Sequence, residues 1–289
     1  MSAIITNNIP DLNLQHSSGQ GFPLYTYTSA EPKPVELSLG DAEKDGRRLN
    51  VSDFALKAYR AAYPDAKIGK EDIFYYVYGL LHSPEYKTRF AADLRKMLPR
   101  IPLAEDFWAF SQAGRKLAAI HLHYEDAQPY PVKEHRDVLE LKDEKLYVVE
   151  KMRFGKVGCG VHAASPSASP EASTSTDAAA DSTLKRAEAR APERGVDKTT
   201  IQYNSHITLT GIPLAAYDYV VNGKPAIEWI MDRYQFSKDK DSQIVNDPND
   251  WAREHDDPKY ILNLLKSIIT VSLETMMVVN GLPGLKERK

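Results

Sequence analysis

Apolar residues recur with helical spacing through the segment 70–125. Between positions 73 and 81 they follow i, i+3, i+4, i+7 and i+8, and the opposite side is also largely apolar. A helix that is apolar on nearly all sides is normally buried. The pattern predicts three consecutive helices, with Ser83-Pro84 beginning the second and Leu98-Pro99 ending it. We call 70–125 the helical hub and expect the rest of the chain to pack on it.

After the hub the period changes from 3.6 to two, in Leu146–Phe154 and again in Thr200–Thr210. In Thr200–Thr210 the apolar positions 201, 203, 207 and 209 alternate with the polar positions 202, 204, 206 and 208. Such alternation is typical of half-buried strands. We therefore predict that the two segments are two strands of one antiparallel sheet.

Helix signals return toward the C-terminus. Pro213 and Pro225 each begin a short helix, and Asn222-Gly223 forms a turn between them. A charged loop begins at Ser237. The run 260–279 is the most apolar long segment, but it contains a lysine and a glutamate, so it predicts a long buried helix rather than a membrane span.

The N-terminal part is more polar. Phe22–Tyr27 predicts a short strand, 31–50 predicts a loop, and Ser52 begins a helix that runs to Tyr63. The segment 163–194 is rich in Ala, Ser, Pro and Thr and then in charged residues, a composition typical of disorder.

These elements predict an α+β fold in which the helical hub packs with a small, mostly antiparallel sheet and a long C-terminal helix. The expected parts are an N-terminal lead and loop at 1–50, the hub with a first strand at 51–156, a disordered low-complexity insert at 157–197, and a second part of strand, short helices and final helix at 198–289.

The amino-acid composition limits how the chain could bind DNA. The 289 residues carry a net charge of −3, the opposite of the basic balance expected of a chain that holds DNA by phosphate contacts alone. Any nucleic-acid contact would then depend on a local cluster of basic residues. The single cysteine, Cys159, excludes an intrachain disulfide, and 1–20 lacks the pattern of a signal peptide, so we expect a cytoplasmic protein.

The sequence lacks the motifs expected of an ATPase and of an adenine-N6 methyltransferase. A phosphate-binding GxxxxGKS/T loop is absent, and Asn246-Asp247-Pro248-Asn249 lacks the second proline and the aromatic of an adenine-N6 methyltransferase loop, so it predicts a turn. Glu140-Leu141-Lys142 with Asp126 or Asp137 has the bare spacing of a Mg²⁺ nuclease, a trio that arises easily by chance in a highly charged chain. His121 and His123 are two residues apart on a predicted helix, so their side chains point in different directions and do not form a shared metal site. We therefore predict no catalytic residue and no metal ligand.

Long literal strings, however, resemble a known family. They are YVYGLLHSPEY, KMLPRIPL and DFWAFSQAGRKLAAIHLHYE in the hub, IPDLNLQHSSGQGFPLY before it, and Ile207–Gln235 and Ile244–Ala252 after it. These strings resemble the C-terminal target-recognition (specificity) region of Type ISP restriction–modification enzymes. Those enzymes are single polypeptides that combine a nuclease, a helicase-like ATPase and an adenine-N6 methyltransferase with that region.

The resemblance implies a function without chemistry in this chain. It implies sequence-specific recognition of double-stranded DNA, which directs methylation and ATP-dependent cleavage by other domains. S-adenosylmethionine, ATP and Mg²⁺ would belong to those domains, with no cofactor here, and 1–50 would join an upstream methyltransferase. The alternative is a structural docking module that couples the methyltransferase and helicase-like/nuclease domains without reading DNA. Neither hypothesis involves a membrane.

DNA contact calls for Arg, Lys, Asn or Gln on rigid elements, because these side chains bind guanine and adenine edges or phosphates. Residues of these types, with one histidine, gather on or near the two predicted strands and on the segment 222–240. The candidate DNA-binding residues are Lys151, Arg153, Lys156, Lys198, Gln202, Asn204, His206, Asn222, Lys224, Arg233, Lys238 and Lys240.

Overall fold

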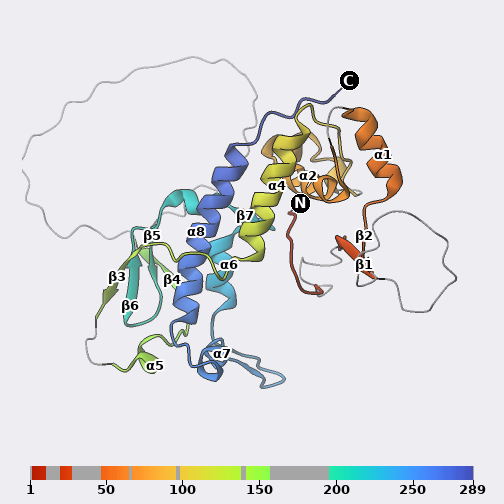
Figure 1. The fold of residues 1–289 in the computed structure, drawn as a ribbon. Coiled ribbons are helices and arrows are strands. Elements are labelled where there is room, and N and C mark those ends of the chain that lie inside the picture. Colours follow the sequence, from red (N-terminus) through yellow and green to blue (C-terminus); the bar gives the residue numbers. More distant parts are fainter. Residues whose placement is uncertain are drawn as a thin grey trace, which may run out of the picture.

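The computed structural model describes residues 2–10, 20–27, 47–64, 67–95, 98–137, 141–156 and 195–288, which form the predicted α+β fold (Figure 1). The helices are α1 (Asp53–Ala62), α2 (Lys70–His82), α3 (Pro84–Arg89), α4 (Phe107–Leu122), α5 (Asp143–Leu146), α6 (Ala226–Arg233), α7 (Asn249–Glu254) and α8 (Tyr260–Asn280), with 3₁₀ turns η1 (Asp93–Arg95) and η2 (Leu214–Tyr217). The strands are β1 (Tyr25–Tyr27), β2 (Arg47–Leu49), β3 (Lys133–Arg136), β4 (Arg153–Lys156), β5 (Val196–Gln202), β6 (Ile207–Thr210), β7 (Val220–Val221), β8 (Lys224–Pro225), β9 (Ser237–Lys238) and β10 (Val245–Asn246).

The hub is built on the close contact of α2 with α4. Gly79 and Gly114 allow the two backbones to touch, since a Cβ added at Gly79 would lie 2.2 Å from the carbonyl oxygen of Phe110. Beside this contact lies an aromatic core in which the rings of Tyr76 and Phe107 stack with centroids 4.9 Å apart. The hydroxyl of Tyr76 donates to the carbonyl of Pro102 at 2.6 Å, so the buried phenol is satisfied by the backbone.

The second half of the molecule is a four-stranded antiparallel sheet in the order β3-β6-β5-β4. Its inner face, which includes the fully buried Ile201 and Leu209, packs against α6 and α8. The long helix α8 joins the two halves: its first turns lie in the core beneath the sheet, and Val279 near its end packs with Leu117 of α4 (Figure 1). The sheet is therefore held on the hub by one continuous helix.

Helix α8 has the length and mean hydropathy (1.5) of a membrane span, but 56% of that apolar window is buried inside the protein. It contacts α4, α6 and η2. The prediction of a long buried helix is confirmed.

Most helix boundaries agree with the sequence. Ser52 accepts a hydrogen bond from the Ala55 amide at 3.2 Å, and Ser83 accepts one from Tyr86 at 3.3 Å, so both begin helices as predicted. The second hub helix is shorter than expected, however, because α3 ends at Arg89 and the single turn η1 follows.

The strand predictions need more correction. Leu146–Phe154 is not one strand: α5 ends at Leu146 and only Arg153–Lys156 forms β4. Thr200–Thr210 is a hairpin of β5 and β6 rather than one strand. In the predicted loop 31–50, Arg47–Leu49 forms β2, which pairs with β1. The predicted insert 157–197 ends too late, since β5 begins at Val196; its part 157–194 lies outside the described residues.

A pair of histidines, His82 buried and His121 half-buried, lies where α2, α4 and α8 meet. His121 shares hydrogen bonds with the Tyr78 hydroxyl at 2.7 Å and the Thr275 hydroxyl at 2.9 Å, and its ring stacks on Tyr219. Burial lowers the pKa of His82 to about 4 and that of His121 to about 3. Both imidazoles are therefore neutral in the folded protein at pH values where they are protonated in the unfolded chain.

We expect acid to destabilise the protein through this pair. Below the unfolded histidine pKa of about 6.5 the unfolded chain binds more protons than the folded one, so stability falls as pH falls from about 6.5 toward 4. Between pH 7 and 5.5 the free energy of unfolding should fall by about 1 kcal/mol for each histidine. Urea unfolding at both pH values measures it. A His121→Gln variant should show a smaller pH dependence, and an equal one would contradict this assignment.

Candidate nucleic-acid interface

One face of the four-stranded sheet is polar, and its side chains are exposed or half-buried within the described residues. The strand register places Arg153, Gln202, Thr208 and His135 side by side in a row across β4, β5, β6 and β3. The neighbouring row carries Phe154, Ile201 and Leu209, which belong to the core on the other face. Because adjacent strand residues point to opposite faces, burial of the second row holds the first toward solvent.

Within this polar row, Arg153 and Gln202 form a directly opposed cross-strand pair, and both side chains are exposed. Within the part of the chain that the structure describes, Arg153 has no ion pair. A guanidinium and a carboxamide on a rigid sheet are the groups that bind guanine and adenine edges in the major groove. The predicted neighbours Lys151 and Lys156 are also exposed, before β4 and at its end.

Lys198 was predicted to belong to the same cluster, and it does lie on β5 beside β4, but its charge is engaged within the protein. Its ammonium lies 2.8 Å from a carboxylate oxygen of Glu228 on α6. Its ammonium also lies 5.5 Å from the ring centroid of Phe154 and 5.3 Å from that of Tyr217, both of which border the core beneath the sheet. Its charge is thus paired within the protein and is not presented beside Arg153.

The prediction that Asn204 and His206 continue the exposed polar face of Gln202 is wrong for Asn204. Asn204 is 8% exposed, and its amide donates to the carbonyls of Leu146 at 2.7 Å and Val148 at 2.9 Å. Its carbonyl accepts from the amides of His206 and Ile207, both at 2.8 Å. Asn204 therefore closes the β5–β6 turn and ties it to the segment before β4, while His206 is half-buried in that turn.

We expect Asn204→Ala to destabilise the fold by about 2 kcal/mol, because buried backbone groups lose their partners. Gln202→Ala, two residues away on the exposed face, should change the free energy of unfolding by less than about 0.5 kcal/mol. Chemical denaturation of both variants measures the difference. Equal stabilities would contradict the structural role of Asn204.

The second predicted group lies around α6 and the hairpin of β9 and β10. Lys224 and Arg233 flank the indole of Trp229, at 4.8 and 5.4 Å from its ring, and Lys224 also pairs with Asp232. Lys238 and Lys240 are exposed on the hairpin. Asn222 forms the predicted turn with Gly223, with φ values of 50° and 82°. The group is thus spread over three elements.

Strand β3 was missed by the sequence analysis, and with it His135 and Lys133 on the exposed face. His135 shares a 2.9 Å hydrogen bond with the Thr210 hydroxyl on β6. The residues of β3 do alternate between inward and outward positions. The inward position is occupied by Glu134 and not by an apolar residue, so the sequence does not show the pattern of a half-buried strand. Burial raises the pKa of Glu134, but hydrogen bonds from Lys266 and Arg136 outweigh this effect and hold that pKa below its usual value.

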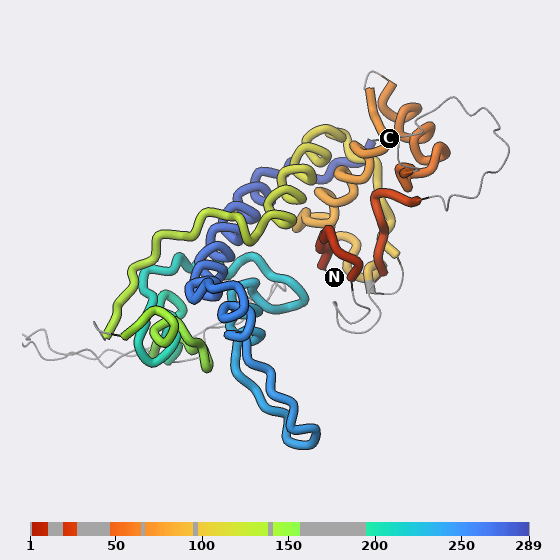
Figure 2. Tube along the Cα trace, turned by 60° about the horizontal axis from the view of Figure 1, so that its bottom comes forward, coloured from red at the N-terminus to blue at the C-terminus, as the bar shows by residue number. Residues whose placement is uncertain are grey.

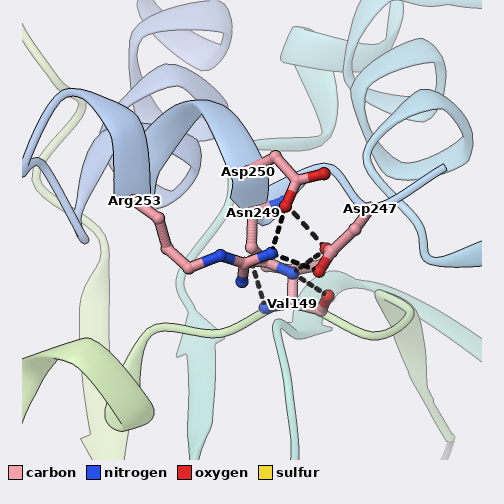
Figure 3. Close-up of polar contacts among 5 residues, drawn as sticks. All are labelled: Val149, Asp247, Asn249, Asp250 and Arg253. Atoms are coloured by element: carbon pink, nitrogen blue, oxygen red, sulfur yellow. Dashed lines mark hydrogen bonds and ion pairs between the residues drawn. The ribbon is translucent and has the colours of Figure 1, made fainter.

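The turn predicted at Asn246–Asn249 anchors the β9–β10 hairpin. Asn249 is buried; its amide nitrogen donates to the carbonyl of Val149 at 2.9 Å, and its oxygen accepts from the Val149 amide at 2.9 Å (Figure 3). Asp247 accepts from Arg253 at 2.6 Å and from the Asn249 side chain at 2.7 Å (Figure 3). These contacts bind the base of the hairpin to the segment that leads into β4.

No group of three or more His, Cys, Asp or Glu side chains among the described residues could hold a metal ion. His121 is half-buried and bonds Thr275, whereas His123 is exposed at the end of α4, so the two diverge as the helical spacing predicts. Of the possible nuclease trio, Glu140 lies outside the described residues.

Comparison with protein families matches residues 1–264 to the Type ISP C-terminal specificity domain. The chain belongs to this family. It is therefore related to a region of Type ISP restriction–modification enzymes, and the resemblance inferred from the sequence strings is confirmed.

Three solved structures that are similar to this specificity domain are complexes with DNA or a DNA mimic. They include a nuclease-deletion mutant of the Type ISP enzyme LlaGI in complex with a DNA substrate mimic (39% identity, 76% of this chain, 14% of that chain, TM-score 0.56). The ATP-dependent Type ISP enzyme LlaBIII bound to DNA is similar over 98% of this chain and 15% of that one (32% identity, TM-score 0.70). The DrdV–DNA complex is similar over 97% and 23% (29% identity, TM-score 0.66).

This specificity domain thus corresponds to roughly a seventh to a quarter of each of these chains. No curated protein matches it significantly.

Proposed function

We propose that this chain is a duplex DNA recognition module that binds a specific sequence through the exposed face of its four-stranded sheet. The observation that carries the proposal is the row of Arg153, Gln202, Thr208 and His135, held toward solvent by the buried row beside it. Such a surface supplies several hydrogen-bonding groups at fixed spacing, which base-edge recognition requires. Membership of a specificity-domain family, with DNA-bound relatives, supports this use of the surface.

In this proposal the chain performs no chemistry. It would fix the position and strand of a neighbouring methyltransferase domain, which flips an adenine and methylates it. It would also direct ATP-dependent cleavage by helicase-like and nuclease domains. S-adenosylmethionine, ATP and Mg²⁺ are proposed to bind those domains, and a cytoplasmic location follows from the proposed partners.

The exposed cations would divide into two roles. We propose that Arg153 and Gln202 contact base edges, while Lys151, Lys156, Lys238 and Lys240 contact phosphates. Lys198 and Asn204 are left out, because their polar groups are engaged within the protein. This division is compatible with the net charge of −3, since phosphate contacts depend on where individual basic side chains lie and not on the charge of the whole chain.

The second candidate function is a docking module that couples other domains without reading bases. The observation that favours it is the extensive hub, whose α2–α4 contact and aromatic core lie apart from the polar sheet face. In this case the Arg153 row would be an ordinary solvated face.

Selection from a pool of random duplexes by the full chain at low salt separates the two functions. A recognition module enriches one short asymmetric sequence. Binding that depends on salt but enriches no sequence would mean phosphate contact without readout. Absence of binding by folded protein would favour the docking module.

A further inference from the structure

The β9–β10 hairpin extends away from the body of the protein (Figure 2). Its strands pair Lys238 with Val245 and Ser237 with Asn246. Every residue from 236 to 246 is exposed, so the hairpin buries little surface against the described part of the chain. A projecting two-stranded ribbon of this kind stabilises the fold little.

The hairpin nevertheless has a fixed shape. At its tip, one carboxylate oxygen of Asp239 accepts from the amides of Asp241 at 3.1 Å and Ser242 at 2.7 Å, and from the Ser242 hydroxyl at 2.8 Å. The Asp239 amide donates to the carbonyl of Ile244 at 2.9 Å. At its base, the Phe236 amide donates to Glu150 at 2.9 Å. A segment ordered before binding loses little entropy on binding.

The base of the hairpin lies next to the start of the proposed DNA-binding face. Val149 and Glu150, which bond Asn249 and Phe236, lie only four and three residues before Arg153. These separations span at most about 13 and 10 Å of extended chain. The hairpin can therefore reach the duplex that Arg153 contacts.

The side chains of the hairpin differ between its two sides. By strand alternation Ile244 and Asn246 share one side, and Val245 and Lys238 share the other. Ile244 is 67% exposed, and the Asn246 side chain makes no hydrogen bond within the described residues. The lysines at 238 and 240 alternate with aspartates at 239 and 241, so net charge does not account for a DNA contact here.

A two-stranded ribbon fits the major groove of DNA, where adenine offers the two groups that an asparagine amide binds and thymine offers an apolar methyl. On the side that they share, Asn246 supplies an amide and Ile244, two residues away, supplies an apolar side chain. We propose that the β9–β10 hairpin enters the major groove beside the sheet and that Ile244 and Asn246 recognise an A·T pair. The inference rests on the proposed DNA-recognition function and adds a second readout element to it.

Replacement of thymine by uracil in the selected duplex tests the proposal, because it removes only the methyl group. With each thymine replaced in turn, we expect one position at which the wild-type full chain binds roughly fourfold more weakly, the value of one buried methyl. Ile244→Ala should weaken binding to the thymine duplex by a similar factor or more. At that position the variant should bind the thymine and uracil duplexes equally.

Val245→Ala is the matched control, since Val245 is 51% exposed on the opposite side of the same hairpin. It should keep the wild-type response to uracil. A wild-type protein that no uracil substitution affects, or an Ile244→Ala variant that still responds, would overturn the inference while leaving DNA recognition by the sheet intact. Failure of the wild-type chain to enrich any sequence would contradict the proposed function itself, and the inference with it.

Discussion

Arg153→Glu is expected to weaken binding to the selected DNA sequence by about 100-fold. A bidentate contact between arginine and guanine contributes about 1–3 kcal/mol, and a carboxylate at that position also repels the phosphates. Arg153 is exposed and has no ion pair in the described residues, so its replacement removes no internal ion pair. Fluorescence anisotropy with the selected duplex at fixed salt measures the loss.

Lys57→Glu makes the same kind of reversal at an exposed cation on α1, far along the chain from the sheet. It should leave the affinity nearly unchanged, while both variants should unfold within about 0.5 kcal/mol of the wild type. Equal loss of affinity in the two variants would mean that overall charge, rather than the sheet face, decides binding.

Gly114→Ala is expected to have the largest effect on stability. A Cβ at Gly114 would lie 1.8 Å from the carbonyl oxygen of Tyr75 and 2.8 Å from the amide nitrogen of Gly79. Backbone atoms cannot rotate away as a side chain can, so α2 and α4 must separate. Because the aromatic core depends on this contact, we expect a loss of at least about 3 kcal/mol, above the usual range for an overpacked core.

Thermal unfolding monitored by circular dichroism measures this loss. Gly21→Ala serves as the control, because an added Cβ at Gly21 meets nothing within 4 Å. It should leave the unfolding temperature within a few degrees of the wild type. A Gly114→Ala protein as stable as this control would show that α2 and α4 can move apart at little cost.

Local signals made the helices predictable from sequence. Ser52 and Ser83 begin helices through their own side chains, and Pro213 and Pro225 precede η2 and α6. The hub was predictable for the same reason, since its apolar period is contained within each helix. These features depend on residues close in the sequence and need no knowledge of the tertiary fold.

The sheet depends on contacts between distant residues, and the sequence predicted it less well. Strand β3 has four residues, and only pairing with β6, more than 70 positions later, holds it in the sheet. Its inward residue is Glu134, whose charge is satisfied by Lys266 on α8. An isolated pattern such as KEHR does not reveal a distant partner that makes burial of a carboxylate acceptable.

Part of the candidate interface was also predictable. Because apolar and polar residues alternate in this segment, the sequence correctly predicted that Gln202 faces away from the core. Arg153 on β4 lies beside it. Alternation failed at Asn204, because the chain turns there and a short amide side chain bonds readily to nearby backbone groups. Lys198 was grouped with Arg153 by its position in the sequence alone, which does not show that its long side chain reaches a carboxylate on another element.

Base readout by the sheet is tested most directly with Gln202→Ala on a set of duplexes that each differ from the selected sequence by one base pair. We expect the variant to lose discrimination at a single position by about 1–3 kcal/mol and to keep the wild-type profile elsewhere, since one side chain contacts one base pair. Uniform weakening on every duplex, or a profile identical to that of the wild type, would contradict recognition of DNA sequence by this face.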